Sequence, residues 1–228
     1  MIVIRSRPLR SLIRTAVPFV IIPALAVLGT LVFDRQKHLI VSMAAAALAL
    51  LLFVTGFEKK STGTRRLVIV SVMTALCFAG RFIPVLKPVA ALTIMTGLYL
   101  GAEAGFLTGA MAAVLSNFYF GQGPWTVFQI LAWGMIGFFA GVLSGQLKKD
   151  ILPLLIYGVV SGIAYSFIMD IWTVLWYDQG FSLSLYKAAL ISAIPYTISY
   201  VVSNLVYLGL LSRPLGEKLE RLHVKYGI

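Results

Sequence analysis

Amide, aromatic and charged side chains gather near the ends of apolar runs from residue 81 onward, and together they could bind a small molecule. All four tryptophans of the chain lie in this region. Convergent polar groups in an aromatic-lined cavity are what a small-molecule site requires. An interfacial aromatic belt would explain some of the rings, but not the amides and the carboxyl group among them. The predicted binding residues are Arg81, Lys87, Asn117, Tyr119, Phe120, Gln122, Trp125, Gln129, Trp133, Asp170, Trp172 and Tyr196.

Each residue type in this set suggests a role. Tryptophans such as Trp125, Trp133 and Trp172 would stack or pack on the ligand. The amides and Asp170 would form hydrogen bonds with it. Arg81 and Lys87 could close over the site or meet an anionic group of the ligand.

Motifs for catalysis and metal binding are missing from the sequence. There is no GxxxxGK[ST] loop for ATP and no HExxH or GxSxG motif. Asp170 is the one acid well inside an apolar run, and the single cysteine, Cys77, has no Cys or His cluster beside it. We therefore expect no catalytic residue, no metal and no covalently bound cofactor. An integral membrane enzyme that uses Asp170 as its acid remains an alternative.

The composition places these residues in a membrane protein. Hydrophobic residues make up 60% of the 228 residues and charged residues only 12%, with a mean hydropathy of +0.94. Soluble domains are about a quarter charged. The net charge of +11 could indicate nucleic-acid binding. Basic loops that fix topology and face anionic lipid explain it better.

Apolar runs predict an all-α, polytopic helical bundle. Cytoplasmic segments carry an excess of Lys and Arg. Most of the 19 Lys and Arg residues lie in every second segment between the apolar runs, and both termini belong to this set. The charge distribution therefore predicts that both termini are cytoplasmic. The basic segment 58–66 divides the chain into an accessory transmembrane hairpin (1–57), a cytoplasmic linker (58–66) and a six-helix binding core (67–228). The predicted spans are 15–33, 39–57, 67–83, 88–101, 104–120, 126–147, 151–177 and 188–212.

Small residues recur at four-residue spacing in several of these spans. Such stripes let helices approach closely. The glycines at 97, 101, 105 and 109 and at 137, 141 and 145 are expected to pack inside the bundle. Ser71, Ala75 and Ala79 are as consistent with docking of a second protein as with packing inside the bundle.

The stretch RFIPVLKPV (81–89) and the segment 101–145, which contains SNFYFGQGPWT, resemble the S components of energy-coupling factor (ECF) transporters. S components are the substrate-binding membrane subunits of ABC importers for vitamins and other micronutrients. The resemblance implies that 67–212 holds the six-helix core and that the AxxxA motif of Ala75 and Ala79, with Ser71, docks on a transmembrane T component. It also implies that two ATPase subunits hydrolyse ATP, and that the chain lies in a prokaryotic cell membrane.

SNFYFGQGPWT is most similar to the cobalamin-type S components, so the resemblance implies that cobalamin or a related corrinoid is the transported ligand. Two alternatives stay open. The chain could be an S component for another vitamin or precursor. It could also be a solitary secondary transporter, although that class usually shows an internal repeat and more intramembrane charge.

Overall fold

The structure is a computed structural model that describes residues 16, 20–21, 24, 60–178 and 181–226. The N-terminal hairpin predicted over residues 1–57 lies almost entirely outside these residues. Helix α4 begins at Lys60, so most of the predicted linker 58–66 is helical.

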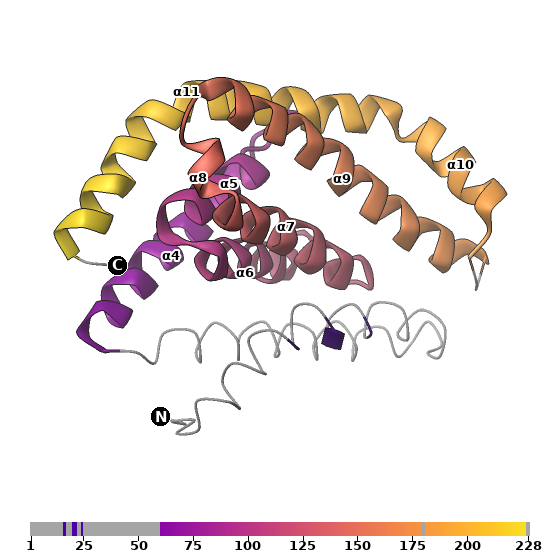
Figure 1. Cartoon of the computed structure of the whole chain (residues 1–228). Helices are drawn as coiled ribbons and strands as arrows, with labels where there is room; N and C mark the ends of the chain where they lie inside the picture. The colour runs from indigo at the N-terminus through magenta and orange to yellow at the C-terminus, as the bar shows by residue number, and fades with distance from the viewer. Residues whose placement is uncertain (1–15, 17–19, 22–23, 25–59, 179–180, 227–228) are drawn as a thin grey trace.

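Helices account for nearly all of the described chain (Figure 1). No strand occurs in residues 60–178 or 181–226, so the all-α prediction is confirmed for this part. The helices are α4 (Lys60–Gly80), α5 (Val89–Leu100), α6 (Ala102–Phe120), α7 (Trp125–Val142), α8 (Ser144–Leu147), α9 (Ile151–Asp178), α10 (Leu183–Ser192) and α11 (Ile194–Tyr226).

Three helices of the described chain are long and apolar enough to cross a membrane: Trp125–Val142, Ile151–Tyr177 and Ile194–Lys225. The other spans predicted between residues 67 and 120 are also largely helical, but none of these helices combines the length and hydropathy of the three. With 12 residues, α5 is about 18 Å long, against about 30 Å for the hydrocarbon core of a bilayer. Arg65 and Arg66 lie in the first turns of α4, and Glu103 in the first turn of α6.

Close glycine contacts hold α5, α6 and α7 together. A methyl group on Gly105 of α6 or on Gly97 of α5 would collide with the main-chain carbonyl of Gly137 on α7. Small residues let helices in a membrane pack this closely. The packing role predicted for these glycines is confirmed, whereas Gly145 has open space around it.

The short α5 lies at the centre of the bundle and contacts α4, α6, α7 and α11. In Figure 1, α9 and α11 lie side by side at the top of the bundle, with α6 below them. Hydrogen bonds from Arg81 to Asn117 and from Ser199 to the Val85 carbonyl bring the loop after α4, the end of α6 and the start of α11 to the same end of the bundle. The candidate site lies at this end.

Candidate binding site

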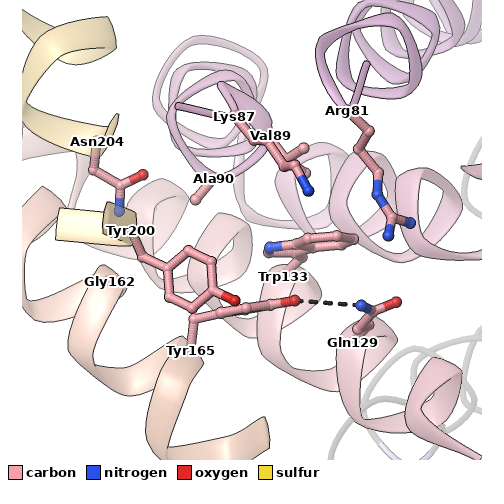
Figure 2. A pocket seen from close by; sticks show the side chains of 10 residues that line it. All are labelled: Arg81, Lys87, Val89, Ala90, Gln129, Trp133, Gly162, Tyr165, Tyr200 and Asn204. Carbon is pink, nitrogen blue, oxygen red and sulfur yellow. Dashed lines mark hydrogen bonds between the residues drawn. The ribbon is translucent and has the colours of Figure 1, made fainter. Parts of the chain in front are cut away.

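A cavity of about 130 Å³ opens between the 81–88 loop and helices α5, α7, α9 and α11 (Figure 2). Polar side-chain ends and aromatic rings face the same space. The lining residues are Arg81, Lys87, Val89, Ala90, Gln129, Trp133, Gly162, Tyr165, Tyr200 and Asn204.

A chain of hydrogen bonds runs along one wall of this cavity. Arg81 Nη1 donates to Asn117 Oδ1 at 2.6 Å, and Asn117 Nδ2 donates to Gln129 Oε1 at 2.7 Å. Gln129 Nε2 in turn donates to the Tyr165 hydroxyl at 3.3 Å (Figure 2). Linked hydrogen bonds strengthen one another where the local dielectric constant is low. The chain therefore fixes the position of the Arg81 guanidinium relative to α6, α7 and α9.

Aromatic rings surround the same guanidinium. The Arg81 Cζ atom lies 4.7 Å from the ring centroid of Phe120 and 5.4 Å from that of Trp133. The electron-rich ring faces attract a cation at this distance. Trp133 also stacks on Tyr165, with centroids 5.2 Å apart and an interplanar angle of 11°. The site thus combines a fixed positive charge with a flat aromatic wall.

The 81–88 loop, which carries both cations, is attached to α11. Three side chains on one face of α11 donate hydrogen bonds to three consecutive main-chain carbonyls of the loop. These bonds join Ser199 to Val85 at 3.0 Å, Tyr207 to Leu86 at 3.1 Å and Ser203 to Lys87 at 2.7 Å.

The middle of this loop has a strained backbone. Val85 has a φ of 63°, although β-branched residues rarely adopt the left-handed region, and its side chain is exposed. Strain of this kind is often found at ligand clamps. Two residues further on, partial burial and the nearby charge of Arg81 lower the pKa of Lys87.

The structure brings several of the predicted binding residues together. Arg81, Lys87, Gln129 and Trp133 line the cavity, and Asn117 and Phe120 contact Arg81. Gln122 lies next to this group. Its side chain donates to the carbonyl of Val114 at 3.1 Å and accepts from Thr126 at 3.0 Å, so it stabilises the turn between α6 and α7.

Besides Asn117, Phe120 and Gln122, five more of the predicted residues do not line this cavity. Tyr119 and Tyr196 are largely exposed. Trp125 and Trp172 contact each other with centroids 5.8 Å apart. Asp170, which is buried on α9, has a carboxylate oxygen, Oδ2, that has no hydrogen-bond partner among the described residues. Contact of these five residues with a ligand therefore stays a prediction.

Sequence reasoning missed three polar or aromatic lining residues, Tyr165, Tyr200 and Asn204. Tyr200 packs edge-on against Tyr165, with centroids 4.9 Å apart, and Asn204 donates to the Gly158 carbonyl at 2.9 Å. Tyr200 and Asn204 follow Tyr196 at four-residue spacing, which places all three on one side of a helix. That spacing is the signal that could have identified the last two.

Ser71, Ala75 and Ala79 form an exposed stripe along α4. Between them, Val72 and Leu76 are exposed as well. This face of α4 therefore packs on no other helix of the described chain.

Comparison with curated proteins and with solved structures gave no significant match. A family model, described as the ECF-type riboflavin transporter S component, matches residues 61–218. The match covers more than half of the chain and agrees with the predicted S component, but it does not support the cobalamin type. It also describes a transporter component rather than an enzyme. On this evidence the chain belongs to the family of ECF-type riboflavin transporter S components.

Proposed function

We propose that this chain captures riboflavin, or a closely related flavin, in the cavity beside the 81–88 loop and delivers it to an ECF-type importer. The observation that carries the proposal is the fixed Arg81 guanidinium beside the stacked rings of Trp133 and Tyr165, in a chain of this family. Residues 67–228 form the binding core in this proposal, and residues 1–57 form an accessory hairpin.

The chemistry of a flavin suits these side chains. Its ring system is flat and aromatic, and one edge carries carbonyl oxygens and an imide N–H. Trp133 and Tyr200 offer ring surfaces, and Arg81 and Lys87 offer donors for the carbonyl oxygens. Gln129 and Asn204 have amides that can both donate and accept.

The size of the cavity requires a movement before a whole flavin enters. Its volume is about 130 Å³, whereas pockets for drug-sized ligands span about 300–1,000 Å³. The 81–88 loop is the element best placed to move, because it covers the cavity and is joined to α11 by hydrogen bonds to single side chains. We propose that the loop opens to admit the ligand and closes over it.

Cobalamin is the second candidate ligand, because SNFYFGQGPWT resembles the cobalamin-type S components. The family match and the small cavity both favour the flavin. A corrin ring is much larger than three fused rings, so it would need a larger rearrangement of the same helices.

The importer needs partners in this proposal. A transmembrane T component would dock on the exposed stripe of α4, and two ATPase subunits would supply the energy. The whole assembly would lie in the cell membrane of a prokaryote, with both termini of this chain in the cytoplasm.

The test is direct binding to the purified full-length chain. We expect riboflavin to bind with a sub-micromolar Kd, measured by quenching of flavin fluorescence, and an excess of cobalamin to leave binding unchanged. Arg81→Gln should weaken binding at least tenfold, whereas Lys187→Gln, an exposed cation outside the cavity, should not. Absence of riboflavin binding would overturn the flavin assignment, and binding of cobalamin instead would establish the second candidate.

Uptake in whole cells separates an importer subunit from a solitary transporter. Riboflavin uptake should require co-expression of a T component and the ATPases. Uptake by the chain alone would instead favour a secondary transporter.

A further inference from the structure

A second pocket, of about 510 Å³, lies at the opposite end of the bundle from the Arg81 cavity. It is formed by the end of α5, the turn before α9, the start of α9 and residues 209–213 of α11. Three of its lining residues, Lys148, Lys149 and Arg213, are cationic. A hydroxyl group of Ser212 and the phenol of Tyr99 also line it.

The three cations differ in their partners. Lys148 Nζ lies 3.1 Å from Glu220 Oε2 and 4.4 Å from the ring centroid of Tyr99, so its ammonium group is held in place. Neither Lys149 nor Arg213 forms an ion pair with any residue that the structure describes. Two cations without an ion-pair partner among the described residues therefore border the pocket, whereas the third, Lys148, is held by Glu220 and Tyr99.

The one acid that lines the pocket, Asp150, lies directly before α9. Asp150 Oδ1 accepts a hydrogen bond from the main-chain N–H of Ile151, the first residue of α9, at 2.6 Å. The N-terminal end of a helix favours negative charge. The lining still carries three cations against this one carboxylate, so the pocket is positively charged.

The other wall of the pocket is apolar. Leu98, Leu147, Ile151 and Leu154 line it, and Leu152 continues it onto the exposed surface of α9. A small inorganic anion would make no favourable contact with this wall. An amphiphile with an anionic phosphate and an acyl chain would occupy both halves of the pocket.

We infer that this pocket binds a phosphate group, with Lys149 and Arg213 as its cationic contacts and Lys148 as a fixed neighbour. The phosphate is carried either by an acidic phospholipid or by a soluble phosphate ester. The apolar wall and the bundle end, which the charge distribution of the sequence places in the cytoplasm, favour the phospholipid. Basic pockets between membrane helices on that side bind acidic head groups. The inference does not rest on the proposed flavin site.

The test uses the full-length chain in nanodiscs that contain equal amounts of phosphatidylglycerol and phosphatidylcholine. Native mass spectrometry after mild release counts the lipids that remain bound. We expect phosphatidylglycerol to be retained in preference to phosphatidylcholine. Each cation near a lipid surface is worth about a fivefold change in affinity, so K149Q/R213Q should reduce this preference about 25-fold. The control K187Q/R221Q removes two other exposed cations and should keep the preference.

Inorganic phosphate distinguishes the two sources. Phosphatidylglycerol retention that K149Q/R213Q abolishes supports the lipid. No lipid preference, but calorimetric binding of millimolar phosphate that the same variant abolishes, supports a soluble ester. If neither probe binds, or if both bind equally to K149Q/R213Q and to the unmodified chain, the inference is wrong. Riboflavin binding should be unchanged in K149Q/R213Q, which verifies the fold and separates this result from the flavin proposal.

Discussion

The hydroxyl group of Ser203 donates a 2.7 Å hydrogen bond to the main-chain carbonyl of Lys87, 116 residues earlier in the chain. This bond joins the middle of α11 to the loop that carries both cations of the candidate site. Together with the bonds of Ser199 and Tyr207 to the same loop, it couples the movement of the loop to the position of α11.

Ser203→Ala should loosen the loop without unfolding the protein. One hydrogen bond contributes about 1 kcal/mol, which corresponds to about fivefold in an equilibrium constant. We expect riboflavin to dissociate about fivefold faster, as measured by stopped-flow fluorescence. Ser192→Ala is the matched control, because its hydroxyl bonds only to the Ala189 carbonyl of its own helix. Equal dissociation rates in the two variants would contradict the role of the loop.

Arg81→Gln should reduce both ligand affinity and stability. The substitution leaves the buried Asn117 Oδ1 without its 2.6 Å partner, and an unsatisfied buried polar atom costs about 1–3 kcal/mol. It also removes the cation beside Phe120 and Trp133. Thermal unfolding in detergent measures the first effect, and riboflavin titration measures the second.

Arg81→Lys gives the finer comparison. Lysine keeps the charge, and its ammonium group can donate to Ser116 and Asn117 as Arg81 Nη1 does, but it lacks the planar guanidinium that lies beside the rings of Phe120 and Trp133. We expect an intermediate affinity for riboflavin. An unchanged riboflavin affinity of Arg81→Lys would show that only the positive charge at this position is needed.

Hydropathy predicted the apolar helices well but not where they end. The predicted span 151–177 agrees with α9, which runs from Ile151 to Asp178. The predicted span 188–212 crosses a break at Ala193 and stops too early, because α11 continues to Tyr226. The apolar run ends near Ser212, whereas backbone hydrogen bonds let a helix continue beyond it as a polar, amphipathic segment.

Residue chemistry predicted one half of the candidate site. Arg81, Gln129 and Trp133 were identified because cations, amides and rings are informative by type. Tyr165 and Tyr200 were missed because residue type alone does not show that they face the cavity. Their contribution depends on how α9 and α11 are rotated against α7, and that rotation is set by packing between helices.

Gly137→Ala should destabilise the bundle. A methyl group at this position would collide with the main-chain carbonyl of Gly105, and backbone cannot move aside as a flexible side chain can. We expect a lower unfolding temperature in detergent. Gly145→Ala is the control, because the space around it is open, and alanine there should leave the unfolding temperature unchanged or raise it slightly. Equal effects of the two substitutions would contradict close packing of α6 on α7.

Replacing Ala75 and Ala79 with phenylalanine should prevent assembly while sparing ligand binding. Both residues are exposed on α4, so larger side chains there do not disturb the core, but they do prevent the close helix approach that small residues allow. We expect the double variant to bind riboflavin normally and to lose co-purification with a T component and its ATPases. Ile156→Phe, an exposed position on α9, is the matched control and should assemble normally. If the double variant still assembles, the partner docks elsewhere. Because ligand binding is measured on the same preparation, loss of assembly with intact binding assigns the stripe to docking rather than to folding.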